Sequence, residues 1–205
     1  FAPASGRQVW TLIDMFPGRP GMTVIGENGG IVMRDGVEVS SHPVDTPTVR
    51  EVIRLVREAT SGPDGIDGGL VMCGKQFAYV ERTADRFVDG VLPYYHRTKR
   101  VDDQIAIIDA IEAGEIDDMI IKLAVYAIGP IEAFAEATLA RFADTHQYAV
   151  SGANWADLQV RGVDKGSAVR DLQRFLGVDR SQTAVFGDAG NDLSMMSEGD
   201  LSFAM

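Results

Sequence analysis

The sequence predicts an α/β protein in which one domain is interrupted by another. Its 205 residues suffice for one or two domains with buried cores. Both ends of the chain alternate short apolar runs with amphipathic helices, which is typical of a parallel sheet covered by helices. The middle follows another order, α-β-β-α-β-α-β-β, and reads as an α+β unit of its own. The predicted division is therefore 1–41 and 156–205 for the interrupted domain and 42–155 for the inserted one.

The first segment predicts a strand end, a helix and a hairpin. Phe1–Ala4 reads as the end of a strand and Ser5–Arg7 as a turn. Apolar residues at helical spacing then predict a helix over residues 8–16, which Pro17 and Gly18 end; they are Val9, Leu12, Ile13 and Phe16. Two β runs follow, joined by a glycine turn at 27–30, and the second closes at "DG".

The middle segment begins with an amphipathic helix in "TPTVREVIRLVREATSG", whose apolar face is Val49, Val52, Ile53 and Val56. Two short strands follow, "GGLVMCG" and "QFAYVE". Residues 83–118 read as helix and loop, 119–129 as a strand, 130–146 as a helix, and 147–160 as two more strands.

The last segment returns to β-α-β order. We expect a helix over residues 165–179 with one apolar side formed by Val169, Leu172, Phe175 and Leu176, ending at Gly177. A buried strand, "QTAVFGD", a short helix, "NDLSMMSEG", and a final strand, "LSFAM", complete the pattern.

Composition narrows the class of protein. Apolar residues make up 45% of the chain, and 19 Lys and Arg against 30 Asp and Glu give a net charge of −11. Such an acidic chain argues against nucleic acid or an anionic membrane as partner. The single cysteine, Cys73, cannot form an internal disulfide and reads as a small buried hydrophobe. With no signal peptide or membrane-length apolar run in view, we expect a cytoplasmic protein.

Three polar clusters fall where strands end, which is where open parallel sheets bind ligands. In "GDAGND", Asp188 follows a strand directly, and Asn191 and Asp192 open the next helix. Carboxylates on such a loop suit Mg²⁺, which prefers oxygen ligands and usually takes one or two carboxylates. The alternative is that Asp188 only caps a helix.

The second cluster is Lys165–Gly166, at the start of a predicted helix. A helix N-terminus has free N–H groups and favours anions, and a lysine there adds a full positive charge. The alternative is a solvated lysine. The third cluster, Ser5, Gly6 and Arg7, can cap a helix or bind a phosphate, and Asn28 in the "GENGG" turn is either a ligand contact or a turn residue. For Trp155 and the Tyr94–Tyr95 pair, core packing is favoured over ligand contact.

In this order the clusters resemble the motifs of the haloacid dehalogenase (HAD) superfamily, and most closely its Cof-type sugar-phosphatase branch. The resemblance implies a Rossmann-like core with a large α/β cap inserted at about 42–155. It implies that Ser5 binds phosphate, that Lys165 steadies the phosphoryl group, that Asp188 holds Mg²⁺ with Asp192 as supporting acid, and that Asn191 faces the phosphate. The expected substrate is a small phosphorylated metabolite, in particular a sugar phosphate.

The resemblance also implies an aspartate nucleophile in an Asp-x-Asp loop, and no such loop occurs in these residues. The chain starts and stops in strand-like residues, so we expect that both ends are cut. For the intact protein the resemblance implies hydrolysis through an aspartyl-phosphate. Two alternatives stay open: a catalytically inactive phosphate-binding homologue, and a phosphomutase.

Overall fold

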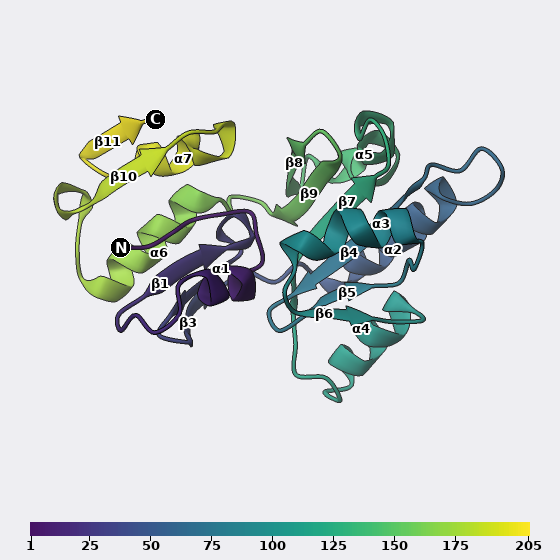
Figure 1. Ribbon diagram of the computed structural model, residues 1–205, viewed down its shortest axis with the longest axis horizontal. Helices are drawn as coiled ribbons and strands as arrows, with labels where there is room; N and C mark the ends of the chain where they lie inside the picture. The colour runs from purple at the N-terminus through teal and green to yellow at the C-terminus, as the bar shows by residue number, and fades with distance from the viewer. The chain divides into compact units, whose positions relative to one another are not determined.

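The computed structural model describes all residues, 1–205, and contains two compact units. Unit 1 is formed by Phe1–His42 and Gly162–Met205, and unit 2 by Pro43–Arg161. Unit 2 is thus an insertion in the sequence of unit 1, and Figure 1 shows it in the middle colours of the chain. The second predicted boundary lies six residues earlier than this division, because β9 (Trp155–Val160) pairs with strands of unit 2.

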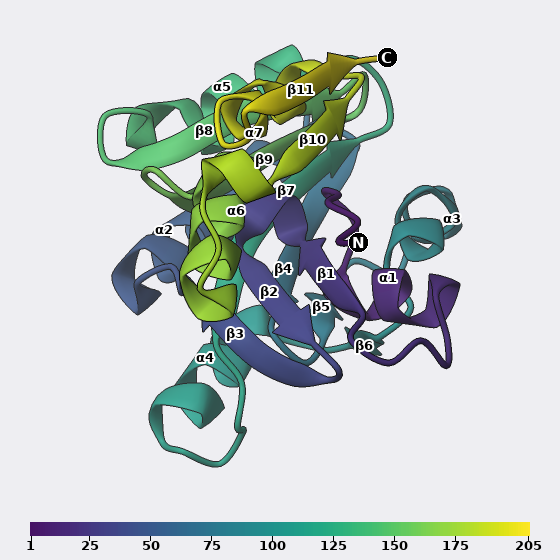
Figure 2. The ribbon, with the colours of Figure 1, turned by 90° about the vertical axis from the view of Figure 1, so that its left-hand side faces the viewer.

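Unit 1 has a three-stranded antiparallel sheet and a separate parallel pair (Figure 2). The first contains β1 (Thr23–Gly26), β2 (Ile31–Arg34) and β3 (Val37–Ser41), in that order. The second contains β10 (Ala184–Gly187) and β11 (Leu201–Ala204). A parallel bridge between Ala4 and Ile25 lies beside β1. Of the parallel pairing that the sequence predicts, the C-terminal part has a strand pair and the N-terminal part a single bridge, beside an antiparallel sheet.

The helices of unit 1 are α1 (Val9–Met15), α6 (Lys165–Leu176) and α7 (Leu193–Met196), with single 3₁₀ turns at η1 (Glu27–Gly29), η4 (Arg180–Gln182) and η5 (Gly190–Asp192). One core cluster joins β1, β2, α6 and α7; it contains Ile25, Val32, Ala168, Val169 and Met195. The predicted apolar side of α6 is wrong at its end, where Phe175 and Leu176 are 58% and 40% exposed. The buried positions of α6 all lie between Lys165 and Gln173, so the last turn falls outside the packed part.

Unit 2 is built on a six-stranded sheet of order β6-β5-β4-β7-β9-β8. Its strands are β4 (Gly68–Gly74), β5 (Ala78–Val80), β6 (Thr98–Arg100), β7 (Ile120–Ala127), β8 (His146–Gly152) and β9 (Trp155–Val160). Neighbours are antiparallel except β5 and β6. The sequence did not predict β3 or β6. Both are edge strands without a continuous apolar run, and β6 is only three residues long.

Helices cover both faces of this sheet. On one face α2 (Thr46–Ala59), α4 (Gln104–Glu112) and α5 (Glu132–Thr138) contribute to the larger core, and the predicted apolar face of α2 is confirmed as buried. On the other face lie α3 (Asp85–Val91) and the turn η2 (Leu92–Tyr94). The helix predicted over 130–146 is shorter, because α5 ends at Thr138, the turn η3 (Ala140–Phe142) follows, and β8 begins at His146.

Aromatic side chains pack on the α3 face, as predicted. The ring of Trp155 lies 4.8 Å from that of Tyr126, 5.6 Å from that of Tyr94 and 6.2 Å from that of Tyr95, measured between centroids. Cys73 is buried in the same cluster, which confirms its prediction as a small core residue. No helix in the chain combines the length and the apolar character needed to cross a membrane.

Candidate active site

Asp188 follows directly after the end of β10. Gly187, the last residue of β10, permits a close approach of Asp192, because a Cβ on this glycine would lie 2.7 Å from the Cβ of Asp192. Asp188 is exposed, and its carboxylate makes no hydrogen bond or ion pair within the protein. The side chain is thus an accessible carboxylate at the carboxyl end of a parallel strand.

Asp192 and Lys165 form a buried ion pair behind this carboxylate. Asp192 Oδ1 accepts a hydrogen bond from Lys165 Nζ at 2.6 Å, and the two side chains are 7% and 6% exposed. Asp192 Oδ2 accepts from the backbone N–H groups of Asp188, at 3.0 Å, and Ala189, at 3.2 Å. Asp192 therefore ties the ammonium group of Lys165 to the loop that carries Asp188.

The pKa of Asp192 reflects these contacts. Burial raises the pKa of its carboxyl group, while the Lys165 ammonium and the two backbone N–H groups lower it by more, so the net pKa lies below the ordinary value. Asp192 is therefore ionised near neutral pH, and its negative charge is balanced by Lys165.

The donor set fits a hard cation bound at a single carboxylate. No group of three or more His, Cys, Asp or Glu side chains gathers to form a metal cage. Both oxygens of Asp192 are already bonded, which leaves Asp188 as the accessible carboxylate. Mg²⁺ commonly takes one or two protein carboxylates and completes its shell with water and substrate phosphate. An ion held by Asp188, with Asp192 in support, is compatible with this arrangement.

The start of α6 differs from the predicted anion site. Ser167 N–H donates to Asp164 Oδ1 at 2.8 Å, within a capping box, and Gly166 N–H donates to Ser194 Oγ at 3.1 Å. The expectation that this helix start has free N–H groups is therefore wrong for these two residues. The positive charge that it offers is the ammonium group of Lys165.

Ser5, Gly6 and Arg7 form a turn against the η1 turn. Ser5 Oγ accepts a hydrogen bond from Arg7 N–H at 3.2 Å, so the hydroxyl acts in the turn as a cap would. Backbone bonds join the two turns, from Asn28 N–H to Ser5 O at 3.0 Å and from Glu27 N–H to Arg7 O at 2.9 Å. A Cβ on Gly6 would lie 2.9 Å from Asn28 Oδ1, so the glycine permits this approach.

Asn28 connects this turn to the "GDAGND" loop. Its Oδ1 accepts a hydrogen bond from Asn191 Nδ2 at 3.1 Å. Its backbone is left-handed, with φ 54° and ψ 30°, a conformation that asparagine tolerates better than most residues. A continuous series of contacts thus links the predicted site residues; they are Ser5, Gly6, Arg7, Asn28, Asn191, Asp188, Asp192 and Lys165.

Three further residues in this series were not predicted: Gly29, Asp164 and Ser194. Gly29 has φ +99°, and a Cβ there would lie only 2.1 Å from Asp164 O. Ser194 receives the hydrogen bond from Gly166. Asp164 carries a sequence signal, because an aspartate three residues before a serine at a helix start is a typical cap. The contacts of Gly29 and Ser194 join distant segments and carry no local signal.

Comparison with known proteins identifies the family. The sequence profile of the haloacid dehalogenase-like hydrolases matches residues 1–205, the whole chain. The chain belongs to this family.

Individual relatives agree with this assignment. The hydrolase is 29% identical over 210 residues to "5-amino-6-(5-phospho-D-ribitylamino)uracil phosphatase YbjI" of Escherichia coli K12, a match that covers 100% of this chain and 71% of that protein. A haloacid dehalogenase-like hydrolase from B. subtilis has the same fold, with TM-score 0.79, 16% identity, and coverage of 100% and 76% of the two chains. So does the HAD subclass IIB sugar phosphatase BT4131, with TM-score 0.69, 15% identity, and coverage of 100% and 73%.

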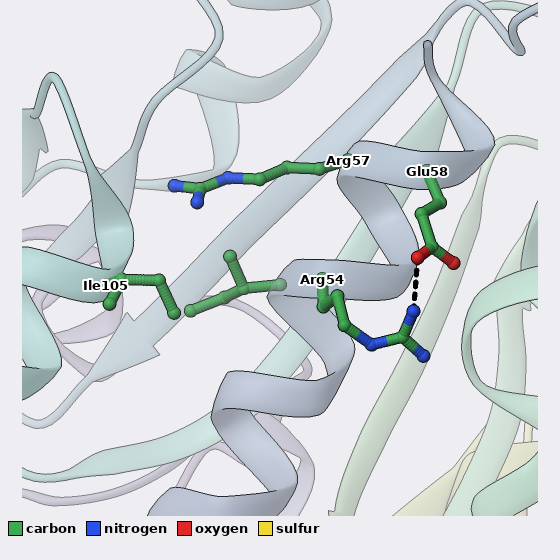
Figure 3. A pocket seen from close by; sticks show the side chains of 5 residues that line it. Arg54, Arg57, Glu58 and Ile105 are labelled. Carbon is green, nitrogen blue, oxygen red and sulfur yellow. Dashed lines mark hydrogen bonds and ion pairs between the residues drawn. The ribbon is translucent and has the colours of Figure 1, made fainter.

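Unit 2 of the hydrolase has a pocket of about 430 Å³ between α2 and α4 (Figure 3). It is lined by Ile53, Arg54, Arg57, Glu58 and Ile105. Arg54 pairs with Glu51 and Glu58, and Arg57 with Glu81 and Asp103. Because carboxylates of the protein already neutralise both guanidinium groups, these arginines do not give the pocket a net positive charge that would bind a phosphate.

Proposed function

We propose that this hydrolase is a phosphatase for small phosphorylated metabolites, with sugar phosphates as the expected substrates and Mg²⁺ as its cofactor. The observation that carries the proposal is the accessible carboxylate of Asp188 beside the buried Lys165–Asp192 pair, at the carboxyl end of β10. Two relatives, one named as a phosphatase of a phosphorylated ribityl compound and one as a sugar phosphatase, support a phosphate ester as substrate.

Each site residue has a role in this reaction. The ammonium group of Lys165 would offset negative charge on the transferring phosphoryl oxygens, and Asp192 holds it in place. The Ser5 hydroxyl, the Asn191 amide and the neighbouring Arg7 are the expected phosphate contacts. Mg²⁺ bound at Asp188 would polarise a phosphoryl oxygen as a Lewis acid.

The proposed route passes through an aspartyl-phosphate and needs a further aspartate as nucleophile. The 205 residues contain no Asp-x-Asp pair that would supply it. In this proposal unit 2 is the inserted cap, and it would select substrates by their leaving group.

The test is the Asp188→Ala variant of the full-length enzyme, with p-nitrophenyl phosphate and a panel of sugar phosphates as substrates. Loss of a metal contribution worth several kcal/mol should lower kcat/KM by about 100-fold or more. Calorimetric titration with Mg²⁺ should show binding to the parent enzyme and weaker binding to the variant. Asp200→Ala, which removes another exposed aspartate of unit 1, is the matched control and should keep the parent kcat/KM and the parent affinity for Mg²⁺.

Other outcomes would redirect the assignment. Undiminished turnover and Mg²⁺ affinity in Asp188→Ala would refute the metal role of this residue. Isomerisation of a hexose phosphate without release of phosphate would identify a phosphomutase. Phosphate binding without turnover by the full-length protein would identify an inactive binding homologue.

A further inference from the structure

The position of the Lys165 ammonium group depends on the backbone at the start of α6. Lys165 is the first residue of this helix, and its side chain is only 6% exposed. A buried amine has little freedom to adjust, so a shift of residues 164–166 would move the charge relative to a bound phosphoryl group. Misplacement of a catalytic group by about 1 Å can cost about 100-fold in rate.

The segment 192–194 holds this helix start at two successive points. At the first, the carboxylate of Asp192 accepts the hydrogen bond from Lys165 Nζ. At the second, Ser194 Oγ accepts the hydrogen bond from Gly166 N–H at 3.1 Å. Together with the packing of Met195 against Ala168 and Val169, these two hydrogen bonds fix the angle between the two segments.

The approach at the second point is too close for a side chain on α6. A Cβ on Gly166 would lie 2.5 Å from Ser194 O and 3.1 Å from Ser194 Cβ. The backbone of α6 therefore meets α7 directly, and the hydroxyl of Ser194 is the group that satisfies the N–H exposed at this crossing.

The contact with Ser194 is additional to the capping of α6. Asp164 already provides the cap, since its Oδ1 accepts from Ser167 N–H and its own N–H donates to Ser167 Oγ at 3.0 Å. The helix has its N-terminal box without Ser194. The Ser194 bond instead joins α6 to the segment that carries Asp192.

We propose that Ser194 is a positioning residue for the reaction, whose hydroxyl holds Gly166 so that the ammonium group of Lys165 lies correctly between Asp192 and the substrate phosphoryl group. This inference rests on the proposed phosphatase function. Ser194 acts through Gly166 and Lys165, so its loss should affect the transition state more than the binding of the substrate.

The test compares three variants of the full-length enzyme at saturating Mg²⁺. Ser194→Ala removes the hydroxyl and should lower kcat about tenfold, with KM for p-nitrophenyl phosphate changed less than twofold. Ser194→Thr keeps a hydroxyl and should recover most of the lost kcat. Ser197→Ala is the matched control, because its Oγ donates to Ser194 O at 2.9 Å and to Glu198 Oε1 at 3.4 Å and forms no hydrogen bond with α6; it should keep the parent kcat.

The outcomes separate this inference from the proposed function. Absence of phosphatase turnover in the parent enzyme would overturn the proposed function itself. With an active parent, an unchanged kcat in Ser194→Ala, or a raised KM at constant kcat, would overturn the positioning role. Equal losses in Ser194→Ala and Ser194→Thr at the same folded fraction, measured by circular dichroism, would also contradict it.

Discussion

At the scale of single residues, two glycines permit the close approach of backbone at the start of α6. Gly29 meets the carbonyl of Asp164, and Gly166 meets the backbone of Ser194. Each pair joins segments that lie far apart in the chain and brings one of them to the start of α6. At both glycines, backbone atoms of the other segment occupy the space that a side chain would fill. The positions of the charged side chains of the site therefore depend on these uncharged residues.

We expect Gly29→Ala to be strongly destabilising. Alanine at φ +99° pays the cost of a left-handed backbone, about 1–2 kcal/mol, and its Cβ would lie 2.1 Å from Asp164 O, which adds the cost of overpacking, about 1–3 kcal/mol. The free energy of unfolding in urea should therefore fall by roughly 2–5 kcal/mol.

Gly18→Ala provides the matched control for this change. Gly18 also has a positive φ, +69°, but a Cβ there would meet nothing within 4 Å. Its cost should be that of the backbone alone, about 1–2 kcal/mol. Equal losses in the two variants would mean that the contact between Gly29 and Asp164 relaxes easily and does not hold α6.

The residues of the site differ in how far the sequence could predict them. Asp188, Asn191 and Asp192 follow a strand within one short motif, and Lys165 opens a helix, so each stood out by local pattern, and the resemblance to the HAD motifs implied their association. The structure brings them together with Ser5 and Asn28. The hydrogen bond between Ser194 and Gly166 could not be inferred, since it depends on the crossing of α6 and α7.

At the scale of elements, periodicity predicted the long amphipathic elements and missed the short edges. The buried face of α2 is the predicted one because a 14-residue helix gives several turns of repeated signal. The strands β3 and β6 lie at sheet edges and have no continuous apolar run, so pairing with a neighbouring strand is not signalled by the local sequence.

The N-terminus of α2 gives a prediction about acid stability. Asp45 Oδ1 accepts a hydrogen bond from Thr48 N–H at 2.9 Å, and its Oδ2 lies 3.4 Å from His146 Nε2. Burial raises the pKa of Asp45, but the hydrogen bonds from Thr48 and the neighbouring His146 lower it by more, to a net value below the ordinary 3.8. The folded state thus favours the ionised cap.

Asp45→Ala should therefore cost about 1 kcal/mol of unfolding free energy at pH 7, the usual value of an N-cap. A carboxyl group with a lowered folded pKa contributes stability above its ordinary pKa and loses it as the pH falls through the folded value. The difference between the parent and Asp45→Ala should shrink as the pH falls below about 4. Urea unfolding across this pH range measures it.

Asp64→Ala is the control for this experiment, because Asp64 is an exposed loop residue that caps no helix. Its effect should stay below about 0.5 kcal/mol, as for most surface substitutions. A difference between the parent and Asp45→Ala that does not shrink below about pH 4 would show that the ionised form of Asp45 does not stabilise the fold.

At the scale of the whole molecule, the chain forms two units that each have a core of their own. The larger cluster of unit 2 contains only residues of Pro43–Arg161, and the cluster of Ile25, Val32, Ala168, Val169 and Met195 lies within unit 1. The sequence predicted the insertion from the change in element order. It placed the second boundary before residue 156 because a short strand gives no sign of which sheet it joins.

Because the two units have separate cores, we expect a destabilising substitution in one unit to increase local unfolding mainly within that unit. Phe134 is fully buried in the larger cluster of unit 2, and Phe134→Ala should cost about 3–5 kcal/mol through lost burial and the cavity left behind. Hydrogen exchange should then accelerate in α2, β4 and β7, while amides of α6 and β1 keep their parent rates. Ile25→Ala in unit 1 should give the reverse pattern, since Ile25 is 1% exposed and packs with α6. Uniform acceleration over all 205 residues in both variants would show instead that the two units unfold cooperatively. The two units would then be separate in structure but would share a single unfolding transition.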